Sequence, residues 1–307
     1  PRAGERILVT RKPVGVVGVI SPFNFPIAIP AWKIAPALIY GNTVVWKPAS
    51  TVPLLAMRLA GALHEAGLPA GVLNLVIGDS AVGDALVHSP GVDAITFTGS
   101  TGVGLRIAAA AGGRGVPVQA EMGGKNASVV LDDADFDLAV DQVLLGAFRS
   151  SGQKCTATSR LVVTEGIADR FLDALLARAN ALRVGDPIDD GTEMGPVVSG
   201  TAQSGITAGI RTAVTQGCEV LAGGGAYSDG PLAEGFFIAP TVLELTGDAD
   251  VWNEELFGPV LAVRRAADAD QAFDLANDSE FGLSAAVFTQ DLTRALQAME
   301  HLDVGVL

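Results

Sequence analysis

Short apolar runs alternate with longer helical patterns along the whole sequence, and this alternation constrains the fold more than any other feature. In the first part of the chain we expect strands at 15–20, 42–46, 72–76, 94–97 and 116–121, with helices at 29–40, 53–66, 82–88 and 102–111. The strands are continuously apolar, which is typical of a parallel sheet covered by helices on both faces. The sequence therefore predicts an α/β fold.

A second series of the same kind follows. We expect strands at 127–131, 161–164, near 220, and at 241–245, 260–264 and 284–288, with helices at 136–148, 167–182, 203–216, 268–277 and 292–301 and a short helical stretch at 156–159. Gly123 and Gly124 separate the two series and mark the expected boundary between two α/β domains. A chain of 307 residues is long enough for two domains of ordinary size.

The composition excludes several classes of protein. A net charge of −14 argues against nucleic acid as a partner. No apolar run approaches the roughly 20 residues that a membrane-spanning helix needs. Two cysteines, Cys155 and Cys218, cannot make a disulfide framework, and three scattered histidines with no Cys/His cluster predict no metal site. We expect a cytoplasmic protein that binds neither nucleic acid nor membrane.

Three polar residues carry the chemistry that we consider. Cys155 has polar neighbours, which suits a partly exposed thiol, whereas Cys218 is interpreted as an inert core residue. Glu121 ends an apolar strand and precedes two glycines, and Asn24, by itself, would be a turn residue. A thiolate can attack a carbonyl, an amide N–H can hold the oxyanion, and a carboxylate can activate water.

The segments PFNFP (22–26), EMGGKN (121–126) and SGQKCT (151–156) resemble motifs of the aldehyde dehydrogenase superfamily and occur in the family's order. The resemblance extends from about residue 12 to residue 307. It implies a Rossmann-type cofactor domain at 13–123, without its N-terminal part, and a second α/β catalytic domain at 124–307, without its C-terminal part. Residues 1–12, in which 6–10 has the pattern of a strand, are expected to be a strand of an oligomerisation hairpin. The chain is thus expected to be cut at both ends.

The resemblance also implies catalytic roles. It makes Cys155 the nucleophile, and it makes Asn24 the oxyanion-hole amide together with the backbone N–H of Cys155. Glu121 becomes the general base that hydrolyses the thioester, and Lys33 lies near the active site, where a proton relay is possible. These roles imply oxidation of an aldehyde to an acid, with hydride transfer to NAD or NADP. A protein with the family's fold but without catalysis, serving in structure or binding, is the alternative of another class.

The same resemblance implies a set of cofactor contacts. They are Ile20, Ser21, Pro22, Phe23, Lys47, Ser50, Gly78, Gly99, Ser100, Gly123, Glu255 and Phe257. Many NAD-preferring relatives carry Glu where this chain has Ser50, and a Glu there repels the 2′-phosphate of NADP. Ser50 removes that repulsion, so NADP is plausible.

The substrate is predicted from two cations next to the nucleophile. Arg149 and Lys154 are expected to bind a distal carboxylate, because a guanidinium offers a planar fork for it. The segments 31–38, 41–47 and 151–159 look most like those of α-ketoglutaric semialdehyde dehydrogenases. Benzaldehyde or vanillin dehydrogenases and succinate-semialdehyde dehydrogenases are the alternatives. By the same resemblance, we expect a homodimer or homotetramer.

Overall fold

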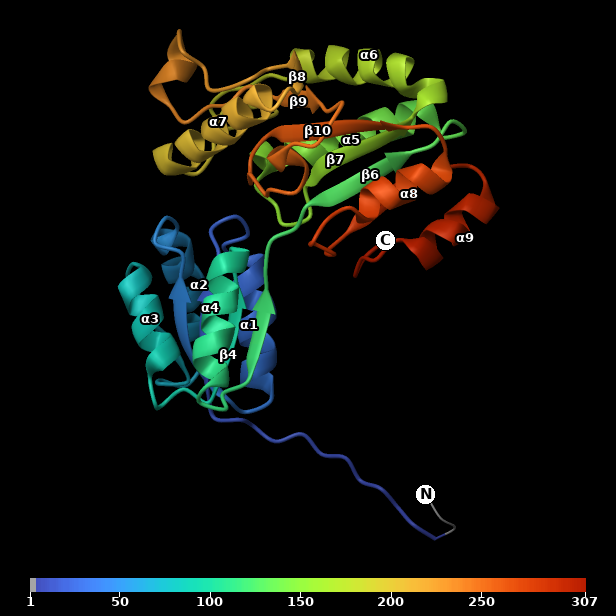
Figure 1. Ribbon diagram of the computed structural model, residues 1–307. Helices are drawn as coiled ribbons and strands as arrows, with labels where there is room; N and C mark the ends of the chain where they lie inside the picture. The colour runs from blue at the N-terminus through green and yellow to red at the C-terminus, as the bar shows by residue number, and fades with distance from the viewer. Residues whose placement is uncertain (1–3) are drawn as a thin grey trace. The chain divides into compact units, whose positions relative to one another are not determined.

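The computed structural model describes residues 4–307, which form two compact units that meet in sequence between Met122 and Gly123 (Figure 1). Each unit has its own β-sheet with helices packed against it. The predicted α/β fold with two α/β domains is therefore confirmed.

The first unit is a parallel sheet of five strands in the order β3-β2-β1-β4-β5. Its strands are β1 (Val16–Ser21), β2 (Thr43–Pro48), β3 (Leu73–Leu75), β4 (Ala94–Thr98) and β5 (Val118–Glu121). Its helices are α1 (Ala28–Ile39), α2 (Pro53–Glu65), α3 (Ser80–His88) and α4 (Thr101–Gly112). The chain moves outward from β1 through β2 to β3 and then returns to β4 on the other side of β1. This reversal is a topological switch point.

Side chains of each strand alternate between two apolar layers. Val17 and Val19 of β1 pack with Ile34 of α1, whereas Ile95 and Phe97 of β4 pack on the other layer with α3 and α4. Figure 1 shows α1 and α4 on opposite faces of the sheet. Successive side chains of a strand point to opposite sides of the sheet, so each strand contributes to both layers. Both faces are buried because helices cover each of them.

The second unit is a sheet of six strands in the order β11-β6-β7-β10-β9-β8, parallel except for the edge strand β8. Its strands are β6 (Asn126–Val130), β7 (Thr158–Thr164), β8 (Glu219–Ala222), β9 (Thr241–Glu244), β10 (Val260–Ala266) and β11 (Ala285–Phe288). Its α-helices are α5 (Phe136–Phe148), α6 (Glu165–Ala181), α7 (Gly200–Thr215), α8 (Ala269–Asn277) and α9 (Leu292–His301). Short 3₁₀ helices are η1 (Arg149–Gly152), η2 (Pro231–Glu234) and η3 (Asp250–Trp252).

The central strand β7 shows how the second core is divided. Leu161 and Val163 are fully buried against α5 and α6, whereas the intervening Val162 is buried on the face covered by α7 and α8. Asp135 and Asp268 accept hydrogen bonds from backbone N–H groups in the first turns of α5 and α8. Such side-chain caps explain why these helices begin where they do.

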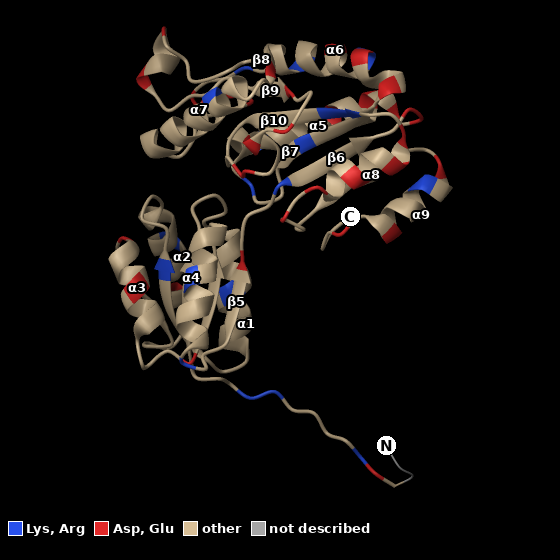
Figure 2. Ribbon diagram, in the orientation of Figure 1, with Lys and Arg blue, Asp and Glu red and all other residues tan. Residues whose placement is uncertain are grey.

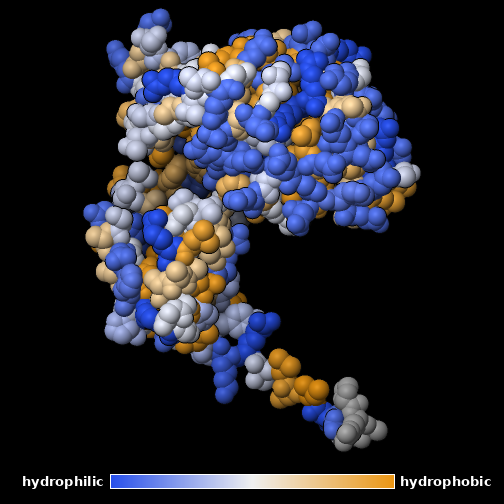
Figure 3. All heavy atoms as spheres, in the orientation of Figure 1, coloured by the Kyte–Doolittle hydropathy of each residue, from blue (hydrophilic) through white to orange (hydrophobic). Residues whose placement is uncertain are grey.

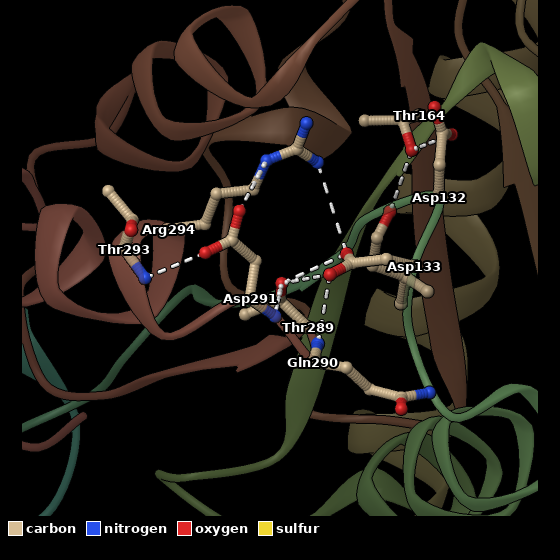
Figure 4. A network of polar contacts seen from close by, with 9 residues as sticks. Asp132, Asp133, Thr164, Thr289, Gln290, Asp291, Thr293 and Arg294 are labelled. Carbon is tan, nitrogen blue, oxygen red and sulfur yellow. Dashed lines mark hydrogen bonds and ion pairs between the residues drawn. The ribbon is translucent and has the colours of Figure 1, made fainter.

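Two loops at the carboxyl ends of β6 and β11 are joined by side chains (Figure 4). The carboxylate of Asp133 accepts hydrogen bonds from the Thr289 hydroxyl at 2.9 Å and from the Gln290 backbone N–H at 3.0 Å. Burial opposes the negative charge, but these hydrogen bonds outweigh it and lower the pKa of Asp133. The neighbouring Asp132 accepts from the Thr164 hydroxyl at the end of β7. These contacts join the loop after β6 to the loop after β11 and to the end of β7.

Charge is unequally divided between the units. Residues 1–122 contain nine Lys and Arg against six Asp and Glu, whereas residues 123–307 contain eleven against 28. Figure 2 shows acidic residues along α6, α8 and α9. The negative charge of the chain therefore belongs to the second unit, and the first unit is net positive. None of the helices described in residues 4–307 is long and apolar enough to cross a membrane.

Two expected elements do not form within the described residues. No strand forms in residues 4–12; residues 1–3 of that expected hairpin strand lie outside the described part of the chain. Ile7, Leu8 and Val9 are 75%, 87% and 84% exposed. A strand needs a hydrogen-bonding partner, and these residues pair with none of the described residues, so a strand that pairs between chains stays a prediction. Figure 3 shows hydrophobic colouring on this N-terminal segment. The stretch 156–159 is not helical either, since Thr158 already pairs with Asn126 at the start of β7.

Candidate active site

The carboxyl ends of the parallel strands in the first unit gather most of its predicted site residues at one edge of the sheet. Ile20 and Ser21 end β1, Lys47 lies at the end of β2, and Glu121 ends β5. In open α/β sheets, ligands bind outside this edge at the switch point, which here lies between β1 and β4. Pro22, Phe23 and Asn24 continue from β1 into a half-buried loop before α1.

The turn from β4 into α4 offers groups for an anion. Ser100 is the N-cap residue, and its side chain makes no capping hydrogen bond with the described residues. The hydroxyl of Thr101 is buried and has no partner in the described part of the chain. A side chain at Gly99 would place Cβ 2.6 Å from the ring of Phe97, so only glycine fits there. An unsatisfied helix N-terminus with such hydroxyls fits a phosphate group.

Lys47 supplies a cation at the same edge of the sheet. Its side chain is only 8% exposed, burial lowers its pKa, and the Asp79 carboxylate opposes that shift. Ser50 lies exposed on the turn that follows β2. Gly78 precedes the N-cap of α3, and a Cβ there would lie 2.3 Å from Val82. Together with the net positive charge of the first unit, these features fit a phosphate-bearing ligand.

Lys33 and Glu121 are connected through Gln119. The Lys33 ammonium donates to Gln119 Oε1 at 2.8 Å, and Gln119 Nε2 donates to Glu121 Oε1 at 3.0 Å. Burial lowers the pKa of Lys33 from 10.5 to about 8, against the attraction of the Glu121 carboxylate. The sequence had suggested Lys33 and Glu121 but gave no indication of Gln119.

In the second unit, the loop that carries Cys155 has an unusual backbone. Ser150 and Ser151 have φ values of 59° and 56°, and Gly152 follows at 67°. A Cβ at Gly152 would lie 2.1 Å from the Gly258 carbonyl oxygen. The hydroxyl of Ser151 donates to the Gly195 carbonyl at 2.8 Å and holds the turn. Left-handed conformations at two non-glycine residues cost free energy, and such strain gathers at functional sites.

Asn126 holds the backbone of the half-buried Cys155. Its Nδ2 donates to the carbonyl oxygens of Cys155 at 2.7 Å and Ala157 at 2.9 Å, while its Oδ1 accepts from the backbone and hydroxyl of Ser284. A Cβ at Gly124 would lie 2.6 Å from the Cys155 carbonyl. The sequence gave Asn126 no role beyond membership of its motif. An amide at the start of a fully buried strand was the available signal.

Glu255 lies against the two glycines. Its Oε1 accepts from the Gly124 N–H at 3.1 Å, and a Cβ at Gly123 would lie 2.0 Å from its Oε2. Burial raises the pKa of Glu255, whereas the Gly124 N–H and the charge of Lys125 oppose that rise. Phe257 follows with a φ of 52°, a further left-handed residue. This geometry explains why glycine is required at 123.

Arg149 and Lys154 flank the turn before the thiol. Arg149 is exposed and begins η1, whereas Lys154 is half-buried next to Cys155. Burial lowers the pKa of Lys154, and the positive charge of Arg149 lowers it further. The charge of Arg149 therefore reaches Lys154, and both cations lie within six residues of the thiol in sequence.

The predicted site residues divide between the two units. Asn24, Lys33 and Glu121 belong to the first unit, whereas Cys155 and Glu255 belong to the second. The sequence model of the Aldehyde dehydrogenase family matches residues 1–307. The chain belongs to the aldehyde dehydrogenase family.

Similar family members differ in their substrates. The chain is 45% identical over 303 residues to the alpha-ketoglutaric semialdehyde dehydrogenase of Bacillus subtilis (strain 168), covering 98% of this chain and 62% of that protein. It is 44% identical over 298 residues to the betaine aldehyde dehydrogenase of Rhizobium leguminosarum bv. trifolii (strain WSM2304). This match covers 97% of this chain and 61% of that protein. The chain spans about three-fifths of the length of these relatives.

A solved family structure has the same fold. The crystal structure of betaine aldehyde dehydrogenase from Staphylococcus aureus in complex with NAD+ matches with a TM-score of 0.93 at 38% sequence identity. The match covers 96% of this chain and 59% of that one. The resemblance predicted from the three motifs is thereby confirmed at the level of family and fold.

Proposed function

We propose that the protein is an NAD(P)-dependent aldehyde dehydrogenase that oxidises an aldehyde to a carboxylic acid. The observation that carries the proposal is the Cys155 loop. Its strained turn and the hydrogen bonds of Asn126 fix the backbone of the thiol within a chain that belongs to this family over its whole length. A loop held in this way preorganises a nucleophile.

In the proposed reaction, the Cys155 thiolate attacks the aldehyde carbonyl. The Asn24 amide and the backbone N–H of Cys155 stabilise the oxyanion that forms. A bound nicotinamide cofactor would supply the hydride acceptor, and loss of the hydride from the adduct would leave a thioester on Cys155. Glu121 then takes a proton from water, which hydrolyses the thioester and releases the acid. We assign residues 13–123 to cofactor binding and residues 124–307 to catalysis.

The cofactor assignment is supported by groups in both units. We propose that the N-terminus of α4, with Gly99 and Ser100, holds the pyrophosphate, and that Ile20, Ser21, Pro22 and Phe23 line the same site. Lys47 and Ser50 are assigned to the adenosine ribose, with Gly78 in the neighbouring loop, and Gly123, Glu255 and Phe257 to the nicotinamide ribose and ring. The NAD+ complex of the S. aureus relative supports this class of cofactor.

The activity is tested by aldehyde-dependent formation of reduced nicotinamide, measured by absorbance in the full protein. Cys155→Ser is expected to abolish turnover while cofactor binding persists, since a hydroxyl is a far weaker nucleophile than a thiolate. Cys218→Ser, at the buried second cysteine, is the matched control and should keep most of the activity. A Cys155→Ser variant that keeps most of its turnover would refute the assignment. Wild-type protein that binds cofactor but oxidises no aldehyde would support a non-catalytic family member.

For the substrate, we propose an aldehyde with a distal carboxylate, such as α-ketoglutaric semialdehyde. The paired cations Arg149 and Lys154 support this choice, as does the B. subtilis relative. They disfavour betaine aldehyde, which carries a quaternary ammonium. Succinate semialdehyde and the uncharged benzaldehyde or vanillin are the alternatives.

A panel of these aldehydes separates the alternatives. Arg149→Ala is expected to raise KM for the acidic aldehydes by about tenfold and to leave KM for benzaldehyde nearly unchanged, because only a carboxylate pairs with the guanidinium. Arg211→Ala, an exposed arginine on α7, is the control. Equal losses for acidic and neutral aldehydes would contradict the carboxylate hypothesis.

We further propose a cytoplasmic homodimer or homotetramer. The exposed apolar residues Ile7, Leu8 and Val9 support self-association, because an apolar run without a strand partner can pair with another chain. Light scattering of the full protein tests the oligomeric state, and a monomer at micromolar concentration would contradict it.

A further inference from the structure

A chain of hydrogen bonds links α1 to the last strand of the first sheet. The Lys33 ammonium donates to the Thr96 hydroxyl at 2.8 Å, to the Phe97 carbonyl at 3.1 Å and to Gln119 Oε1 at 2.8 Å. An ammonium has three N–H donors, so each one has a partner here. The positive charge is thus held in one place between β4 and β5.

These bonds determine which way the Gln119 amide faces. Its Oε1 accepts from Lys33 and also from the Thr96 hydroxyl. Two donors on one side allow only the oxygen end there, so the NH₂ end is turned toward Glu121. Gln119 Nε2 then donates to Glu121 Oε1 at 3.0 Å. Reversing the amide would place its NH₂ against an ammonium and its oxygen against a carboxylate, and both contacts would be repulsive.

We infer that Gln119 is a positioning residue for the general base: its locked amide holds one oxygen of Glu121 and presents the other to the water. The inference rests on the proposed role of Glu121 in hydrolysis. Gln119 and Glu121 are both exposed in the first unit, and an exposed carboxylate without such a contact would sample several rotamers. Holding one rotamer raises the fraction of time in which the base is correctly placed.

Glutamine suits this position because it can accept from a cation and donate to an anion at once. A glutamate at 119 would pair with Lys33 and repel Glu121, and a methionine of similar length would contact neither. Thr96 reinforces the arrangement, because its hydroxyl accepts from Lys33 and donates to Gln119. Lys33 lies in α1, Thr96 in β4 and Gln119 in β5. The arrangement of these three side chains therefore depends on the folded unit.

The test separates acylation from deacylation in the full protein. Stopped-flow absorbance gives the burst of reduced cofactor, which reports acylation, and the steady-state rate, which reports hydrolysis of the thioester. Gln119→Met is expected to leave the burst rate within about twofold and to lower the steady-state rate about tenfold, a part of what a general base contributes. Thr96→Val should lower the steady-state rate by a smaller factor and also leave the burst rate nearly unchanged. This variant replaces Gln119→Met in the test if Gln119→Met fails to fold. Gln297→Met, at an exposed glutamine of α9, is the matched control.

A double-mutant cycle distinguishes this role from a structural one. In a Glu121→Gln background, Gln119→Met should cause no further loss, because there is no base left to position. Equal slowing of burst and steady state, or additive losses in the double variant, would overturn the inference. If Glu121→Gln slows deacylation but Gln119→Met does not, only this inference fails. If Glu121→Gln has no effect on deacylation, the proposed role of Glu121 fails as well.

Discussion

Arg160 offers the sharpest test of how the second unit is stabilised. The side chain is 2% exposed, and its guanidinium donates to four carbonyl oxygens: Lys125 at 2.8 Å, Leu275 at 3.2 Å, Ala276 at 2.7 Å and Asp278 at 3.1 Å. Leu275 and Ala276 belong to the last turn of α8, whose carbonyls have no partner within the helix. Arg160 therefore caps α8 and ties it to the segment before β6.

The cost of removing this side chain can be worked out from these contacts. Hydrogen bonds to a charged donor contribute about 1.5–3 kcal/mol each, and the lower end of that range gives about 6–8 kcal/mol for four. Burial lowers the pKa of Arg160 from 12.5 to about 10, with the charge of Asp278 opposing the shift and that of Arg264 adding to it. A net shift of that size corresponds to about 3 kcal/mol, the cost of holding the charge in this environment, which the variant regains. The net expectation for Arg160→Met is a loss of about 3–5 kcal/mol, a large part of the usual stability of a domain.

Urea unfolding followed by circular dichroism measures this loss in the full protein. Arg160→Lys keeps the charge but cannot reach carbonyls on both sides, so we expect an intermediate loss. Arg178→Met is the control, because its ion pairs with Asp137 and Asp141 are solvent-exposed and contribute at most about 1 kcal/mol. A loss for Arg160→Met no larger than that of the control would refute the reasoning.

Three further predictions concern the site. Lys125 is 2% exposed, and burial lowers its pKa from 10.5 to about 7. Between pH 7 and pH 10.5 the unfolded chain therefore binds one more proton than the folded chain, and the stability of the wild type rises with pH over this range. Lys125→Met should melt higher than wild type at pH 7, with a difference that shrinks toward pH 9; parallel melting curves would contradict this. Asn126→Ala should cost about 2 kcal/mol and slow the acylation burst, since Cys155 loses its support; an unchanged burst rate would argue against that support. Ser50→Glu should weaken NADP by about tenfold or more and NAD little, because a carboxylate near the 2′-phosphate costs about 1–4 kcal/mol; unchanged NADP affinity in a titration would mean that residue 50 does not face the ribose.

Local sequence pattern predicted the elements of the sheets well. The helices at 136–148 and 292–301 were placed at their observed ends, and most other elements differ by a few residues. Apolar spacing predicts such elements because each is formed by neighbours in sequence and by one buried face. The strand expected in residues 6–10 does not form within this chain, for the complementary reason. A strand depends on a partner that may be distant in the chain, and an apolar run alone does not supply one.

The sequence by itself determined the fold class, the family and the residue types that can carry the chemistry, because motif and periodicity are local properties. Only the tertiary structure decided how those residues are supported. Asn126 reaches Cys155 across 29 positions, Lys33 reaches Gln119 across 86, and Gly124 reaches Glu255 across 131. No local pattern records such contacts. They exist because parallel strands bring the same ends of distant segments to one edge, where a side chain can bind only what the folded sheet places within about 3 Å of it.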